Sequence, residues 1–197
     1  AWISHTPKSG NVNDSSIVTS LYSSGYFRTE SELEKHHTFM EKGGGINIEY
    51  SIPVFTFGAS AQYLEYDKKI ESSSKAAFSG KKGMLTSVYS FVNYRSIAAG
   101  VEFSNDAGNN MGIKSGIQFY HKKFEAAFNF RHFPVKYRSP YSYNFGESYM
   151  PVDETGFYAG FRWKGIKNAD INTYVDFFGG RSAGYSMDTP VIPSCFL

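Results

Sequence analysis

The chain has little of three things that would assign it to a common class of protein. Its 197 residues include a single cysteine, Cys195, which excludes an intramolecular disulfide and any thiolate metal cluster. With 20 basic and 18 acidic residues, its net charge of +2 gives no electrostatic reason to expect a nucleic-acid partner. No apolar run approaches the roughly 20 residues that a membrane helix needs, and the mean hydropathy is −0.36.

Aromatic residues, in contrast, are abundant. They make up 18% of the chain, with 18 Phe and 15 Tyr. High aromatic content without apolar blocks is typical of a transmembrane β-barrel, because half of each strand faces a polar lumen. The composition therefore favours membrane strands over membrane helices.

The apolar residues follow a period of two along segments of about ten residues. Between residues 123 and 132, Phe124, Ala126, Phe128 and Phe130 alternate with polar side chains. This period predicts β-strands with one apolar and one polar face, and their length suits an antiparallel up-and-down transmembrane β-barrel. We place eight strands at 44–51, 55–66, 84–94, 96–105, 112–121, 123–132, 156–164 and 169–178.

Each strand is expected to turn one face to lipid and the other to the lumen. The predicted lipid-facing residues are Phe55, Phe57, Tyr63, Ile97, Val101, Phe103, Ile117, Phe119, Phe124, Phe128, Phe130, Phe157, Phe161, Trp163, Ile171, Val175 and Phe177. The predicted lumen-facing polar residues are Glu102, Lys114, Gln118, Lys123, Glu125, Asn129, Arg131, Arg162, Lys164, Asp170, Asn172 and Asp176. In the strand 84–94 the pattern is ambiguous, because Val88 and Val92 compete with Leu85, Tyr89 and Phe91 for the outward face.

The connections between the predicted strands alternate in length. Short ones fall at 52–54, 95, 122 and 165–168, and longer ones at 67–83, 106–111, 133–155 and after 178. Bacterial outer-membrane barrels have short periplasmic turns and longer outer loops. Both ends of the eight-strand block lie on the long-loop side, so we expect at least one strand to be missing before Gly44 and one after Phe178.

The sequence divides into residues 1–43, a loop or plug segment with short helices; 44–178, the barrel strands; and 179–197, an irregular, truncated tail. In the first segment, Asn13 or Asp14 could cap a helix, and a second helix follows the capping-box spacing that begins at Thr29. The glycines 43–45 are expected to break the chain. Since Ala1 is not preceded by a signal peptide, we expect the chain to be processed or partial.

Four stretches, at 25–35, 97–104, 116–124 and 155–164 with 174–178, resemble the C-terminal barrel of Bacteroidota and Ignavibacteria-type envelope proteins that carry an N-terminal helix-hairpin-helix domain. The resemblance implies an outer-membrane location and further strands on both sides, but no defined activity. The helix-hairpin-helix part is absent here, so no DNA contact is assigned. The chain departs from the family after Pro190.

Two groups of polar residues are candidates for chemistry. His36 and His37 lie near Glu32, Glu34 and Glu41, but adjacent histidines on a helix point about 100° apart and the H-E-x-x-H spacing is absent, which favours a solvated helix. A serine hydrolase could use His121 or His132, but no G-x-S-x-G context surrounds a serine.

Two further motifs are better explained by structural roles than by chemistry. The glycines 43–45 lack the G-K-[ST] of a phosphate loop. The Tyr-rich stretch 137–149 could bind sugar or peptide, or form an aromatic belt at a membrane interface, and we favour the belt. The sequence thus predicts no catalytic residue, metal or cofactor.

The leading interpretation is a fragment of a non-enzymatic barrel of the bacterial outer membrane, with membrane lipid as its partner and a structural, anchoring or pore role. The charges on the lumen face could fill a narrow barrel with ion pairs or line a wet channel. A soluble antiparallel barrel or sandwich that binds an apolar ligand, with the Phe faces inward, is the alternative. An outer-membrane hydrolase is a weaker third.

Overall fold

Strands dominate the chain. The computed structural model describes residues 1–22, 25–72, 78–139, 153–166, 169–180 and 194–196. In chain order the elements are β1 (Trp2–Lys8), β2 (Gly10–Val12), β3 (Ile17–Leu21), α1 (Glu30–Leu33), β4 (Phe39–Ser51), β5 (Phe55–Ile70), β6 (Gly80–Tyr94), β7 (Ile97–Asp106), β8 (Met111–Tyr120), β9 (Phe124–Phe133), β10 (Glu154–Ile166), β11 (Ala169–Gly179) and β12 (Ser194–Phe196).

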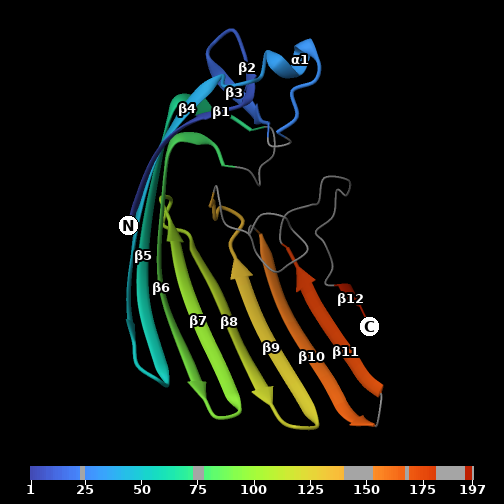
Figure 1. Cartoon of the computed structure of the whole chain (residues 1–197). Helices are drawn as coiled ribbons and strands as arrows, with labels where there is room; N and C mark the ends of the chain where they lie inside the picture. The colour runs from blue at the N-terminus through green and yellow to red at the C-terminus, as the bar shows by residue number, and fades with distance from the viewer. Residues whose placement is uncertain (23–24, 73–77, 140–152, 167–168, 181–193, 197) are drawn as a thin grey trace.

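The strands form an antiparallel sheet in which each strand from β4 to β12 pairs with its neighbours in the sequence (Figure 1). The order across the sheet is β1-β4-β5-β6-β7-β8-β9-β10-β11-β12, and the hairpin β2–β3 is attached to β5. The predicted all-β, up-and-down class is therefore confirmed. Within the described residues the sheet does not close into a barrel, since β1 and β12 lie at its two edges.

The eight predicted strands correspond to β4–β11. Strands β4, β5 and β6 extend four or five residues further than predicted. The added part of β4 pairs with β1, the end of β5 pairs with β3, and the added part of β6 pairs with β5. The connections β4–β5, β6–β7, β8–β9 and β10–β11 take two or three residues, at the lower end of the sheet in Figure 1.

At the opposite end the connections are longer, with one exception. The β7–β8 connection has only four residues, because Asp106 closes it. Its Oδ1 accepts hydrogen bonds from the backbone N–H groups of Gly108 and Asn110, each at 2.9 Å. The predicted alternation of loop length holds for the other connections that the structure places.

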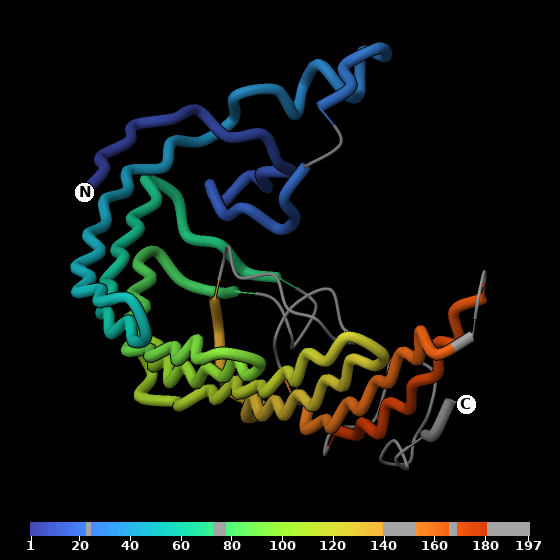
Figure 2. Tube along the Cα trace, turned by 60° about the horizontal axis from the view of Figure 1, so that its bottom comes forward, coloured from blue at the N-terminus to red at the C-terminus, as the bar shows by residue number. Residues whose placement is uncertain are grey.

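The sheet curves strongly, so that it has a concave and a convex face (Figure 2). Side chains alternate between the faces along each strand, and the register therefore fixes which residues share one. One row of register partners crosses the seven strands from β5 to β11 and includes Phe57, Val101, Phe130, Phe157 and Phe177. All the residues predicted to face lipid share this face, which we call the apolar face.

The opposite face, the polar face, carries the residues that were predicted to face the lumen. Glu102, Lys114 and Arg131, for example, are register partners on β7, β8 and β9. Lys123 differs from the set, because it lies in the turn before β9. The ambiguity in β6 is resolved: Val88 and Val92 share the apolar face, whereas Tyr89 and Phe91 share the polar face.

The helix expected after Asn13 is wrong, since this part of the chain forms the hairpin β2–β3. Asn13 Oδ1 accepts hydrogen bonds from the backbone N–H groups of Ser15 at 3.1 Å and Ile17 at 2.9 Å, and Ser16 takes a φ of 59°. Asn13 therefore shapes a hairpin turn instead of a helix start. The β-branched residues 17–19 also favour a strand.

The second predicted helix is present as α1, but it ends at Leu33 and does not continue to His37. Its capping box is complete. The side chain of Thr29 accepts from the Glu32 backbone N–H, and the Glu32 carboxylate accepts from the Thr29 backbone N–H. Local sequence chemistry was sufficient to predict this helix start.

The glycines 43–45 do not break the chain but lie within β4, which pairs there with β1. A Cβ atom at Gly45 would lie 2.5 Å from Trp2 Nε1, and one at Gly43 would lie 2.9 Å from Leu64 Cδ2. The glycines therefore give space to side chains from the neighbouring strands.

The tail was not expected to supply a strand, and for residues 194–196 this is wrong. They pair with Asp176–Phe178 as β12. Pairing with an open sheet edge uses backbone groups, so it does not require alternating side chains.

A buried apolar cluster lies at the long-connection end of the polar face. It comprises Val18, Phe39, Leu64, Tyr66 and Ile70, each at most 3% exposed. Strand β3 brings Val18 to it by pairing in parallel with β5. The hairpin β2–β3 consequently lies on the concave side of the sheet (Figure 2).

Candidate functional site

The apolar face exposes large hydrophobic side chains on every strand from β4 to β11. Ile48 is 67% exposed, Phe57 50% and Phe128 46%. The other exposed members are Ile46, Tyr50, Phe55, Tyr63, Met84, Val88, Val92, Tyr94, Ile97, Phe103, Ile117, Phe119, Phe130, Phe157, Phe161, Trp163, Ile171 and Phe177. Proteins that are monomeric in water rarely expose contiguous apolar surface beyond a few hundred Å², so this face requires a covering.

Polar groups delimit this face at its long-connection end. Lys42, Glu65 and Lys82 are register partners on β4, β5 and β6, and Lys82 Nζ lies 3.6 Å from Glu65 Oε1. Further along, His132 Nδ1 lies 2.7 Å from Thr155 Oγ1. The apolar surface therefore ends at a polar boundary.

On the polar face, side chains reach across an intervening strand. The Tyr89 hydroxyl on β6 lies 3.0 Å from Asn47 Oδ1 and 2.9 Å from Glu49 Oε2, both on β4. Gly58 on β5 leaves the path open, since a Cβ atom there would lie 2.3 Å from Tyr89 Cζ. The concave curvature brings alternate strands close enough for these contacts.

Arg131 makes the most buried ion pairs on the polar face. It is 3% exposed, and Glu154, which accepts a hydrogen bond from its Nε, is 6% exposed. Its Nη1 and Nη2 donate to the two carboxylate oxygens of Asp176 at 3.1 and 3.2 Å, a bidentate pair that crosses β10 above Gly156. Two of the predicted lumen residues, Arg131 and Asp176, are thus brought together.

A second ion-pair network lies near the short turns. Arg162 donates to Asp170, Lys164 donates to Glu125, and Arg162 Nη1 lies 3.9 Å from Glu125 Oε2. Arg162 and Asp170 are more than 40% exposed. Charged residues therefore form ion pairs toward both ends of the polar face.

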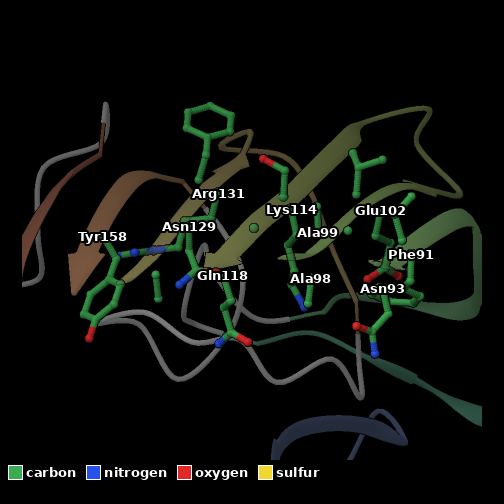
Figure 3. Close-up of a pocket in the computed structure, with 17 residues that line it drawn as sticks. Phe91, Asn93, Ala98, Ala99, Glu102, Lys114, Gln118, Asn129, Arg131 and Tyr158 are labelled. Carbon is green, nitrogen blue, oxygen red and sulfur yellow. The ribbon is translucent and has the colours of Figure 1, made fainter. Parts of the chain in front are cut away.

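The polar face also holds a cavity of about 700 Å³, which Arg131 helps to line (Figure 3). It spans β6 to β10, and its lining includes Phe91, Glu102, Lys114, Gln118, Asn129 and Tyr158. Alternation predicted the shared face of these residues except Phe91, whose strand had an ambiguous pattern. It gave no signal for the cavity, whose ends depend on the placement of aromatic rings across strands.

The metal candidate does not assemble. The rings of His36 and His37 are stacked with centroids 3.6 Å apart, Glu32 is occupied by the capping box, and Glu41 pairs with Lys8 at 3.3 Å. Across the described part of the chain, no group of three or more His, Cys, Asp and Glu residues could hold a metal ion.

The hydrolase candidates also lie apart. His132 is hydrogen-bonded to Thr155 on the apolar face. His121 Nδ1 accepts a hydrogen bond from the backbone N–H of Lys123 in the β8–β9 turn. The two histidines therefore sit at opposite ends of β9.

Most of the Tyr-rich stretch, residues 140–152, lies outside the described residues. Tyr137 is buried at 1% exposure against Phe133, and its hydroxyl donates to Ser104 Oγ at 2.8 Å. Burial raises the pKa of the Tyr137 phenol, which keeps it protonated as a donor. Tyr137 itself is thus not part of an exposed aromatic belt.

In the residues that the structure describes, no helix is long and apolar enough to cross a membrane. Searches of family models, of curated proteins and of solved structures gave no match to this chain. The resemblance to envelope proteins with a helix-hairpin-helix domain therefore stays a prediction.

Proposed function

We propose that this chain forms part of the wall of a non-enzymatic β-barrel in a bacterial outer membrane, with a structural, anchoring or pore role. The observation that carries the proposal is the exposed apolar face, continuous over β4–β11, on the convex side of a sheet whose concave side is polar and ion-paired. A transmembrane barrel needs this distribution, with apolar side chains toward lipid and polar ones toward the lumen.

The height of the apolar face supports the same proposal. On β6 it extends from Met84 to Tyr94, about ten residue steps. At about 3.3 Å per residue and a tilt near 40°, this corresponds to roughly 25 Å, the height of the apolar band in outer-membrane barrels. Tyr50, Tyr94 and Trp163 are exposed at the short-turn end, where interfacial aromatic residues are expected.

The alternative, a soluble barrel that binds an apolar ligand, requires the Phe face inside. Here Phe57, Phe128 and Phe157 are 43–50% exposed, and the cavity lies on the opposite, polar face. An apolar ligand would therefore have to bind the convex surface. The distribution of side chains favours lipid as the covering.

A complete wall also requires paired edges, because unpaired backbone groups are costly in hydrocarbon. Within the described residues, β1 pairs with β4 only from Phe39 to Gly45, and β12 covers three residues of β11. We therefore propose that further strands of the parent protein pair with residues 46–51 of β4 and with the exposed edge of β11.

The test compares two neighbouring residues on β9 in protein folded into phospholipid vesicles. Phe128→Arg places a charge on the apolar face and should lower the free energy of unfolding by roughly 2–4 kcal/mol. Asn129→Arg places it on the polar face and should cost less. Urea titration in vesicles measures both.

Equal losses for the two variants, or a larger loss for Asn129→Arg, would contradict the proposed orientation of the barrel. Recovery of the wild-type chain as a soluble monomer without detergent would overturn the membrane location itself.

A further inference from the structure

The cavity on the polar face contains two opposite charges that do not pair with each other. Glu102 and Lys114 are direct register partners on β7 and β8. Opposite charges in this position normally attract, and both residues are partly buried. Yet among the described residues neither side chain takes part in an ion pair or hydrogen bond.

Their neighbours on the same face behave differently. Arg131 and Asp176 are paired, and so are Glu125 and Lys164. Glu102 and Lys114 line the cavity of about 700 Å³ together with Arg131. Two charges of opposite sign on neighbouring strands of one cavity, neither of them in an ion pair, match a small ligand that carries both charges itself.

The rest of the lining narrows the ligand class. Figure 3 shows Glu102 beside Phe91 and Asn93 at one end of the cavity and Tyr158 at the other, with Gln118 and Asn129 between them. Phe91, Ala98 and Ala127 supply apolar contact. Gln118 Oε1 already accepts a hydrogen bond from the Tyr120 hydroxyl, so Gln118 offers its amide N–H groups, whereas the Asn129 amide can both donate and accept. A cavity of this volume accommodates a small molecule of dipeptide size.

We propose that this cavity binds a zwitterionic amino acid or short peptide. Glu102 accepts hydrogen bonds from the ligand ammonium group, Lys114 donates to its carboxylate, and the amides of Gln118 and Asn129 contact the peptide bond. An apolar side chain of the ligand lies against Phe91. The proposal rests on the proposed function, since the cavity faces the lumen only if the apolar face meets lipid. A neutral saccharide would leave both charges uncompensated.

The experiment uses the whole chain folded in detergent micelles, with isothermal titration calorimetry as the measurement. The probes are alanyl-phenylalanine with free termini, its N-acetyl derivative, its C-terminal amide, and maltose as a neutral probe. The free dipeptide should bind more tightly than the other three. Glu102→Gln and Lys114→Gln should each weaken its binding roughly ten- to a hundred-fold, because each removes a charge-assisted hydrogen bond.

The pairing of variant and probe makes the test specific. Glu102→Gln should have little further effect on the N-acetyl derivative, and Lys114→Gln little on the amide, since each probe already lacks the corresponding charge. Lys123→Gln is the matched control: it makes the same change in a turn outside the cavity lining and should leave affinity unchanged. Circular dichroism of each variant verifies that it folds.

The proposal is overturned if the blocked dipeptides or maltose bind as tightly as the free dipeptide. It also fails if Lys123→Gln weakens binding as much as Lys114→Gln, or if the folded wild type does not bind the dipeptide. Vesicle insertion of the same preparation separates this proposal from the membrane proposal. Insertion into vesicles without dipeptide binding would contradict only the proposed binding site. Dipeptide binding by a chain that stays soluble would support the binding site and contradict the proposed membrane barrel.

Discussion

Arg131 illustrates how the polar face holds charge away from water. Its guanidinium is almost fully buried, and the carboxylates of Glu154 and Asp176 occupy both its Nε and its two terminal nitrogens. Gly156 lies beneath it, where any larger residue would collide with the guanidinium. A buried ion is tolerated when its partners satisfy its hydrogen bonds, as they do here.

Arg131→Met should therefore be costly, because it removes the buried ion pairs that the guanidinium makes with Glu154 and Asp176. We expect the free energy of unfolding to fall by about 3–5 kcal/mol, measured by urea titration of the folded chain in vesicles. Arg162→Met is the control. Its ion pairs are more than 40% exposed, and its loss should cost about 1 kcal/mol or less. Similar losses for the two variants would show that burial of Arg131 does not govern its contribution.

At the scale of the element, the helix start at α1 depends on a local network around Glu32. Its carboxylate accepts hydrogen bonds from the backbone N–H of Arg28 at 2.7 Å, from the Tyr22 hydroxyl at 3.0 Å and from the backbone N–H of Thr29 at 3.1 Å. These bonds stabilise the charged form and lower the pKa of Glu32 below its ordinary value of 4.5.

The lowered pKa predicts a pH-dependent helix start. A carboxyl whose pKa is lower in the folded state stabilises that state above the unfolded pKa, and the contribution is lost as pH falls through the folded pKa. Carboxyl ¹³C NMR titration should give Glu32 a pKa below 4.5, and Tyr22→Phe should raise it. A pKa that does not respond to Tyr22→Phe would contradict the hydrogen-bond explanation.

Features that depend on residues close together in the sequence could be predicted, whereas features that depend on contacts between distant residues could not. Alternation along ten residues predicted β4–β11 and the shared faces, and the capping box predicted the start of α1. The hairpin β2–β3 was missed because Asn13 can cap a helix or shape a turn. The choice depends on Val18 packing against Phe39 and Leu64, residues distant in the sequence.

The same reason explains the errors at the glycines 43–45 and at the cavity. A glycine run has no side-chain pattern, and its place within β4 follows from the Trp2 ring on the neighbouring strand. The cavity depends on where Phe91 and Tyr158 lie across five strands. Neither arrangement leaves a local signal in the chain.

At the scale of the whole molecule, the curved sheet has two faces of opposite chemical character. A protein that folds in water buries its apolar side chains and exposes its polar ones. This sheet instead exposes Phe side chains on its convex face and buries the ion pairs of Arg131 on its concave face. The proposed lipid covering on the convex side would account for both faces together.

The measurement that tests this most directly is spin-label accessibility along β9 in phospholipid vesicles. Cys195 is replaced by serine, and a label is attached at each position from Phe124 to Phe130 in turn. Oxygen, which dissolves in the bilayer, should collide most with labels at Phe124, Ala126, Phe128 and Phe130. A water-soluble nickel chelate should collide most with labels at the positions between them. Absence of this alternation, or the opposite phase, would contradict a lipid-facing apolar surface.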